Sequence, residues 1–273
     1  MSNSITIVTA LYDIDRENMG DGRKFEQYLS WFKDTLKIQR PMVVFVDEYL
    51  VSFVEESRKG LPTKIISQKL EEIPYYFLND KINDIISSHE YKNKMQHSHR
   101  LECGLSLYNV VIYSKFLWMK KAIEENFFKS DYFMWIDAGL SRFFLNHDVD
   151  INQLYPSENA TKILLENKNN VLVHASMSYF PEITQAQKLE ESYFWDYRTF
   201  VMAGLWGGGS TILTKLCEMV DDVLQNKMIK NNVINNEMSA LGYLLKNNDE
   251  MFTVFENYSH IHREYEIISE LAK

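Results

Sequence analysis

Short apolar runs alternate with longer amphipathic stretches along this chain of 273 residues. An apolar run bounded by turn residues is typical of a buried strand, whereas apolar residues spaced three and four apart are typical of a helix. Helices are predicted over residues 23–38, 73–88, 105–126, 212–223 and 233–245, with a solvated loop over residues 89–100. The predicted strands are Ile5–Leu11, Met42–Val46, Thr63–Ser67, Tyr132–Ile136, Lys162–Leu165, Val171–Ala175, Phe200–Trp206 and Met251–Phe255.

The order of these elements predicts the fold class. A strand, a helix and a second strand follow one another within residues 5–46, which is the pattern of a βαβ unit. Crossovers between parallel strands are right-handed and place helices on the faces of the sheet, so we expect an α/β fold with a mostly parallel central sheet. Since no internal repeat or linker interrupts the pattern, one domain over residues 1–273 is expected.

The most informative stretch is Tyr132–Gly139, where an apolar run leads into Asp137 and then into Ala138 and Gly139. A run of this kind is typical of a strand buried on both faces, and open α/β sheets bind ligands at the carboxyl ends of their strands. Asp137 is therefore a candidate ligand for a divalent cation, because Mg²⁺ prefers oxygen ligands. The alternative is an aspartate that caps the turn after the strand.

Composition narrows the class of protein. Hydrophobic residues make up 45% of the chain and charged residues 25%, as in an ordinary globular protein. The net charge of -9 argues against broad nucleic-acid binding, which needs a basic surface. The two cysteines, Cys103 and Cys217, are too few for a disulfide framework. No signal-peptide pattern or membrane-spanning run is visible, so we expect a cytoplasmic protein, with peripheral membrane contact left open.

Two further segments contain residue types that bind ligands. Gly207–Gly209 lies between an apolar run and a predicted helix, where a glycine turn and the helix N-terminus could approach a phosphate. A tight turn without a ligand is the alternative reading. His260 and His262 follow the last predicted strand, and alternation along an extended segment would point both imidazoles to one side. Either histidine could complete a metal shell with Asp137.

Several polar residues lie next to these segments. Glu237 is near a predicted helix start, where the helix dipole already favours a carboxylate, so its role is either structural or catalytic. Asp196 precedes Arg198, which could clamp a phosphate or pair with that aspartate on the surface. Asn109 and Lys115 are polar residues of the long helix over residues 105–126, with an exposed surface position as the alternative.

These residues resemble the bacterial HtrL/YibB family. The resemblance covers most of the chain and rests on Ile5–Ile14, Tyr108-Asn109, Ser114-Lys115-Phe116, Trp135–Gly139 and Gly204–Gly208. It implies a glycosyltransferase of the GT-A type, with a nucleotide-binding α/β/α sandwich and a nucleoside-diphosphate sugar as donor. Residues 1–139 would form the nucleotide-binding half and residues 140–273 the acceptor half.

The resemblance also implies a set of site residues. Asp47 would lie near the base or ribose, and Asp137 would match the first acid of the Asp-x-Asp motif. The second acid is missing from Asp137-Ala138-Gly139, so His260, His262 or water would complete the shell of a Mn²⁺ or Mg²⁺ ion. We expect Glu237 and Asp196 to be catalytic. The residues expected to bind the nucleotide sugar are Thr9, Ala10, Leu11, Tyr12, Arg16, Asp47, Asn109, Lys115, Trp135, Asp137, Ala138, Gly139, Gly207 and Gly208.

The resulting functional hypothesis is metal-assisted transfer of a sugar to a cell-surface glycan or glycolipid, such as lipopolysaccharide or capsule. Because the motif lacks its second acid, a catalytically silent nucleotide- or glycan-binding protein is the alternative. A metal-dependent phosphohydrolase would need more clustered carboxylates than the sequence contains.

Overall fold

A computed structural model describes residues 4–147, 149–151, 153–178, 180–256 and 266–273 of the chain. Its centre is one seven-stranded sheet in the order β3-β2-β1-β4-β6-β5-β7. Only β6 runs antiparallel to its neighbours, so the predicted α/β fold with a mostly parallel sheet is confirmed. The strands are β1 (Ile5–Leu11), β2 (Met42–Val46), β3 (Thr63–Ser67), β4 (Tyr132–Ile136), β5 (Val171–Ala175), β6 (Val201–Gly209) and β7 (Phe252–Glu256).

The helices agree with most of the predicted pattern. Two predictions were wrong: Lys162–Leu165 lies in a helix instead of a strand, and the expected loop over residues 89–100 contains helix α4. The α-helices are α1 (Phe25–Thr35), α2 (Val51–Ser57), α3 (Asn79–Ser87), α4 (His89–Lys94), α5 (Ser106–Glu125), α6 (Glu158–Glu166), α7 (Pro181–Thr184), α8 (Ser210–Asp222), α9 (Glu237–Asn247) and α10 (Glu266–Glu270). A π-helical turn, Val223–Met228, continues α8.

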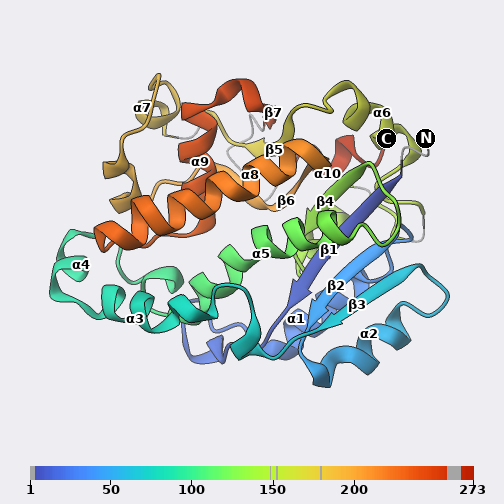
Figure 1. Ribbon diagram of the computed structural model, residues 1–273, viewed down its shortest axis with the longest axis horizontal. Coiled ribbons are helices and arrows are strands. Elements are labelled where there is room, and N and C mark those ends of the chain that lie inside the picture. The colour runs from blue at the N-terminus through green and yellow to red at the C-terminus, as the bar shows by residue number, and fades with distance from the viewer. Residues whose placement is uncertain (1–3, 148, 152, 179, 257–265) are drawn as a thin grey trace.

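Alternating strand residues point to two separate hydrophobic cores, one on each face of the sheet. Val8 of β1 and Phe133 of β4 pack into the core that α3, α5, α8 and α9 cover. Ile7 and Met134, the neighbours of those residues, pack into the core that α1, α2, α6 and α10 cover. Figure 1 shows α5 and α8 lying side by side across the first face. The expected α/β/α sandwich is therefore the observed architecture.

The predicted glycine turn is wrong, because Gly207–Gly209 continues strand β6. β6 runs antiparallel between β4 and β5, and Gly207 lies opposite Met134. A Cβ atom on Gly207 would lie 2.8 Å from the Phe133 carbonyl oxygen and 2.7 Å from Met134 Cγ. The glycine thus allows β6 to lie close against β4. Gly207 and Gly208 pair with the first half of β4, whereas Asp137 follows its carboxyl end.

Gly207→Ala should lower the free energy of unfolding by about 1–3 kcal/mol, because the added methyl group forces β4 and β6 apart. Urea denaturation measures the change. Gly104→Ala is the matched control: its Cβ would meet only the flexible end of Met19, at 3.1 Å, so its effect should stay within about 0.5 kcal/mol. Equal stability of the wild-type and Gly207→Ala proteins would contradict this packing argument.

Candidate functional site

A pocket of about 390 Å³ opens at the carboxyl ends of β1 and β4. These strands are parallel neighbours, so their ends meet at one edge of the sheet. The turn after β4 is anchored to α1, since Thr35 Oγ1 donates to the Ala138 carbonyl oxygen at 2.9 Å. The lining comprises Ala10, Leu11, Tyr12, Asp13, Ile14, Asp15, Arg16, Glu17, Arg23, Phe25, Glu26, Tyr28, Tyr108, Val111, Ile112, Lys115, Trp118, Trp135, Asp137, Ala138, Gly139, Arg142 and Glu237.

One face of α5 forms a wall of this pocket. Tyr108, Ile112, Lys115 and Trp118 lie three or four residues apart, so their side chains project from the same side of the helix. Burial raises the pKa of Tyr108 well above its ordinary value of 10.0, an effect strengthened by Glu237, Glu102 and Asp137 and weakened by Arg16. Tyr108 therefore keeps its proton and can donate a hydrogen bond to a ligand oxygen.

Lys115 joins two carboxylates that are far apart in the sequence. Its Nζ donates to Asp137 Oδ1 at 3.1 Å and to Glu237 Oε1 at 2.7 Å. A third hydrogen bond, at 3.3 Å, reaches the carbonyl oxygen of Ala203 in β6. These acceptors satisfy all the donors of an ammonium group. The antiparallel strand thus takes part in the site through Ala203, and not through its glycines.

Burial and the charge of the ion-pair partner shift the pKa values of Lys115 and Glu237 in opposite directions. The side chains of Lys115 and Glu237 are 4% and 8% exposed. Burial raises the pKa of Glu237 above its ordinary value, and Asp137 adds to this effect, while Lys115 opposes it. For Lys115, burial lowers the pKa, but Asp137 and Glu237 outweigh it and hold the pKa above its ordinary value. Lys115 is therefore a stable buried cation at neutral pH.

Asp137 keeps one oxygen available to a ligand. Its Oδ1 accepts hydrogen bonds from Lys115 and, at 2.6 Å, from Trp135 Nε1. The backbone nitrogen of Asp137 donates to the Gly204 carbonyl oxygen, which fixes the start of the turn. Neither side-chain bond uses Oδ2, and the side chain is 42% exposed. This oxygen can therefore accept a hydrogen bond within the pocket.

Stacked aromatic rings hold Trp135, which donates a hydrogen bond to Asp137. Trp118 stacks on Tyr12 with ring centroids 5.4 Å apart and on Trp135 at 6.3 Å. Trp135 stacks on Trp206, which stacks on Phe116. Because close-packed rings have little rotational freedom, the Trp135 nitrogen is held in place to bind Asp137.

Three arginines, Arg16, Arg23 and Arg142, line the same pocket as Asp137 and Glu237. Arg16 and Arg23 share Asp21, which contacts the first at 2.5 Å and the second at 2.6 Å. Arg16 also donates to the Tyr28 hydroxyl at 2.5 Å. The Arg142 guanidinium lies over the Trp31 ring, 5.0 Å from its centroid. Since a guanidinium group binds phosphate in a fixed bidentate geometry, these arginines could bind an anionic ligand in the pocket.

Gly139 makes room for one of these arginines. A Cβ atom at this position would lie 2.8 Å from an Arg142 terminal nitrogen and 3.3 Å from the Trp31 ring. The predicted role of Gly139 was direct contact with the nucleotide. In the structure it lines the pocket and also allows Arg142 to approach the turn after β4.

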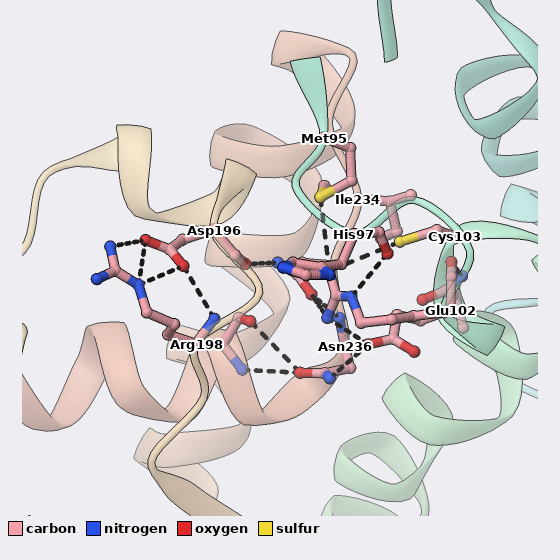
Figure 2. Close-up of polar contacts among 12 residues, drawn as sticks. Met95, His97, Glu102, Cys103, Asp196, Arg198, Ile234 and Asn236 are labelled. Carbon is pink, nitrogen blue, oxygen red and sulfur yellow. Dashed lines mark hydrogen bonds and ion pairs between the residues drawn. The ribbon is translucent and has the colours of Figure 1, made fainter. Parts of the chain in front are cut away.

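A buried polar network fixes Glu237 at the start of α9. Figure 2 shows the facing side chains of Glu102 and Asn236, whose Oε1 and Nδ2 atoms lie 2.9 Å apart. Asn236 Oδ1 caps α9 by accepting from the Ser239 backbone nitrogen at 3.1 Å. Asn109 Nδ2 holds the Glu102 carbonyl oxygen at 2.6 Å. Asn109 does not line the pocket, and its contact with Glu102 lies one step away from it; the expected contact with the nucleotide sugar stays a prediction.

Asp196 lies outside the lining of this pocket, so the structure does not bring it together with Asp137 and Glu237 there. It forms hydrogen bonds and an ion pair with Arg198, and Figure 2 shows the two side chains facing each other. Burial raises the pKa of Asp196, but the bonds and charge of Arg198 outweigh it and hold the pKa below its ordinary value of 3.8. A strong base is therefore not found here, and Arg198 is engaged by carboxylates.

The remaining predicted binding residues divide by position. Ala10, Leu11, Tyr12, Arg16, Trp135 and Ala138 line the pocket. Thr9 is fully buried and lies on the same side of β1 as Ile7 and Leu11, which pack into the core that α1, α2, α6 and α10 cover. Asp47 caps the turn after β2 by accepting from the Glu48 backbone nitrogen at 2.6 Å. Thr9, Asp47, Gly207 and Gly208 are absent from the lining, so this pocket does not support the direct contacts that were expected of them.

The donors that the structure describes around Asp137 do not form a metal site by themselves. Within the described ranges, no group of three or more His, Cys, Asp or Glu residues could hold a metal ion. Asp137 and Glu237 both contact the Lys115 ammonium, which would repel a divalent cation bound between them. His260 and His262 lie outside the described residues.

Several residues that line the pocket were not predicted from the sequence. Arg23 reaches the pocket from the segment before α1, Tyr28 from α1 itself and Arg142 from the segment after β4. Their position in the sequence could have indicated two of them. Arg142 lies shortly after Asp137, and Arg23 lies just before α1. No helix among the described residues is long and apolar enough to cross a membrane.

Two solved structures match most of this chain at low sequence identity. Mouse xyloside xylosyltransferase 1, in its apo form, is 9% identical with a TM-score of 0.41, and the match covers 92% of this chain and 84% of that one. 4-Diphosphocytidyl-2C-methyl-D-erythritol synthase from Anaerococcus prevotii DSM 20548 is 10% identical with a TM-score of 0.39, covering 98% and 97%.

Sequence comparison places the chain in a family. Protein HtrL from Escherichia coli (strain K12) is 26% identical over 149 residues, which span 51% of this chain and 52% of that protein. The match thus spans about half the length of this curated relative. The model of the HtrL_YibB family, described as bacterial protein of unknown function, matches residues 3–263, so the chain belongs to the HtrL_YibB family.

Proposed function

We propose that this chain is a glycosyltransferase that moves a sugar from a nucleoside-diphosphate sugar to a cell-surface glycan, such as lipopolysaccharide or capsule. One domain over residues 1–273 would do this, with the donor bound mainly by residues 1–139 and the acceptor by residues 140–273. The observation that carries the proposal is the pocket at the ends of β1 and β4. It combines a half-exposed carboxylate with arginines at a position where α/β sheets bind ligands.

The arginine side of the pocket supports a diphosphate. Aromatic faces and Asp21 restrain the guanidinium groups of Arg16, Arg23 and Arg142, so little side-chain freedom is lost when a ligand binds. Bidentate hydrogen bonds from arginine to phosphate are strong. These groups would also stabilise the negative charge that develops on the departing nucleoside diphosphate.

The carboxylate side supports chemistry on a sugar. Asp137 Oδ2 could accept a hydrogen bond from a sugar hydroxyl, while its negative charge would stabilise the positive charge that develops at the anomeric carbon. Glu237, rigidly held by Lys115 and by the cap of α9, would act beside it. Tyr108 would donate to a ligand oxygen. The acceptor class rests on the family resemblance alone.

A thermal-shift panel of UDP, GDP, CDP and CMP, each with and without Mn²⁺, tests donor binding. A nucleotide at a hundred times its Kd should raise the melting temperature by about 5 °C for a chain of this length. Arg142→Met should reduce this shift. Arg198→Met, the same change at an arginine outside the pocket, should not.

The absence of a shift with every nucleotide would refute donor binding. Release of nucleoside diphosphate from the bound sugar nucleotide then separates an enzyme from a binding protein. Binding without any turnover would favour the catalytically silent alternative.

A further inference from the structure

The starting observation is the saturated, buried ammonium group of Lys115. Three acceptors surround its nitrogen, namely Asp137 Oδ1, Glu237 Oε1 and the Ala203 carbonyl oxygen. This nitrogen occupies the space between two carboxylates at the carboxyl end of β4. A divalent cation that bound both carboxylates and this carbonyl oxygen would need the same space.

The position of Lys115 is built into the fold. Lys115 lies in the middle of the long helix α5, so its backbone is fixed by packing against β1 and β4. On the other side, the cap of α9 and the buried bond between Asn236 and Glu102 fix Glu237. An ion pair held from both sides in this way differs from a solvated surface pair, whose long side chains move freely.

The surrounding donor set matches an ammonium better than a metal ion. Asp137 Oδ1 already accepts from Lys115 and Trp135, and Ala138 and Gly139 provide no second acid. A divalent cation on the other oxygen of Asp137 would be repelled by the Lys115 charge across one carboxylate. The arginines that line the pocket supply further positive charge for an anion.

We propose that Lys115 is the resident cation of this pocket, in the place of a divalent metal, and that the pocket binds a nucleoside diphosphate without one. The first part concerns the protein alone. The second part rests on the proposed function, because that function defines the ligand. Two experiments keep the two parts apart.

The first experiment compares nucleotide binding in EDTA and in MnCl₂. The wild-type protein should show the same thermal shift and the same Kd in both buffers. A shift that appears only with Mn²⁺ would overturn the proposal. A protein with no shift in either buffer would refute the proposed function, and the second experiment would then decide the role of Lys115.

The second experiment uses Mn²⁺ without any nucleotide. Lys115→Met leaves Asp137 and Glu237 facing each other without a cation, so Mn²⁺ should bind there and raise the melting temperature by about 5 °C at a hundred times its Kd. The wild-type protein should show no such shift. Neither should Lys120→Met, which removes a lysine of the same helix outside the pocket.

Adding Glu237→Gln to Lys115→Met removes one ligand and should abolish the Mn²⁺ shift. If Lys115→Met folds only when Mn²⁺ is present, recovery of the folded protein on adding the metal is the same supporting result. Equal stabilisation of the wild-type and Lys115→Met proteins by Mn²⁺ would overturn the assignment, as would a Lys115→Met protein that Mn²⁺ neither folds nor stabilises.

Discussion

Lys115→Met is expected to lower the free energy of unfolding by about 3–5 kcal/mol, because it leaves a buried glutamate without its counter-charge. The Lys115 and Glu237 side chains are 4% and 8% exposed, so water cannot replace the lost hydrogen bonds. Methionine has a similar length and fits apolar surroundings, so lost packing contributes little. Urea denaturation at neutral pH in metal-free buffer measures the change.

The same substitution at Lys120 is the matched control. Lys120 lies in the same helix and pairs with Glu218, but its side chain is 30% exposed and that of Glu218 is 60% exposed. A surface pair of this kind contributes at most about 1 kcal/mol. Combining Lys115→Met with Glu237→Gln removes the unpaired carboxylate and should restore most of the lost stability. A Lys115→Met protein as stable as Lys120→Met would contradict the buried ion pair.

The destabilisation should also depend on pH. Burial and Asp137 raise the pKa of Glu237 above its ordinary value of 4.5, and Lys115 opposes this rise, so the variant should have a higher pKa still. Between the ordinary and the raised pKa, the folded variant binds more protons than the unfolded chain. Its stability should therefore increase as the pH falls through that window, relative to the wild-type protein.

Local patterns predicted the strands well because both faces of the sheet are covered. Every residue of β2, β4 and β5 is buried, so β2 and β4 are uninterrupted apolar runs and His174 is the one polar residue in β5. The strand expected at Lys162–Leu165 failed because a short apolar run also fits one face of a helix. Ser157, whose side chain accepts from the Ala160 backbone nitrogen, was the overlooked sign of a helix start.

The glycine segment shows a different limit of sequence reasoning. Three glycines before a helix are typical of a turn, yet here they lie within an antiparallel strand. Their small size is required by β4 on one side and by the Lys168–Asn170 backbone on the other. The direction of a strand depends on distant pairing partners, so the local sequence does not encode it.

Single residues of the candidate site could be predicted from the sequence, but the contacts between them could not. Asp137 follows an obvious strand, and Lys115 lies on an obvious helix, so both could be named from local pattern. Their contact, and the part that Glu237 takes in it, depends on the packing of α5 and α9 against the sheet. Arg142 and Tyr28 approach from elements whose positions only the fold defines.

Asp137→Asn is expected to reduce turnover of the sugar nucleotide by about 100-fold or more, since it removes a charge placed where positive charge develops. The amide oxygen can still accept hydrogen bonds from Trp135 and Lys115, so the local geometry should persist. Binding of nucleoside diphosphate should stay equal or become tighter, because a negative charge near an anion is lost. Release of nucleoside diphosphate gives kcat, and calorimetry in EDTA gives Kd.

Asp47→Asn is the control for this split between turnover and binding. Asp47 also follows a parallel strand, but its side chain caps a turn outside the pocket, so both quantities should remain unchanged. A metal ligand at Asp137 would behave differently, because its loss would weaken binding and turnover together and only when Mn²⁺ is present. Loss of turnover with retained metal-free affinity therefore assigns Asp137 to the sugar and Lys115 to the cation position.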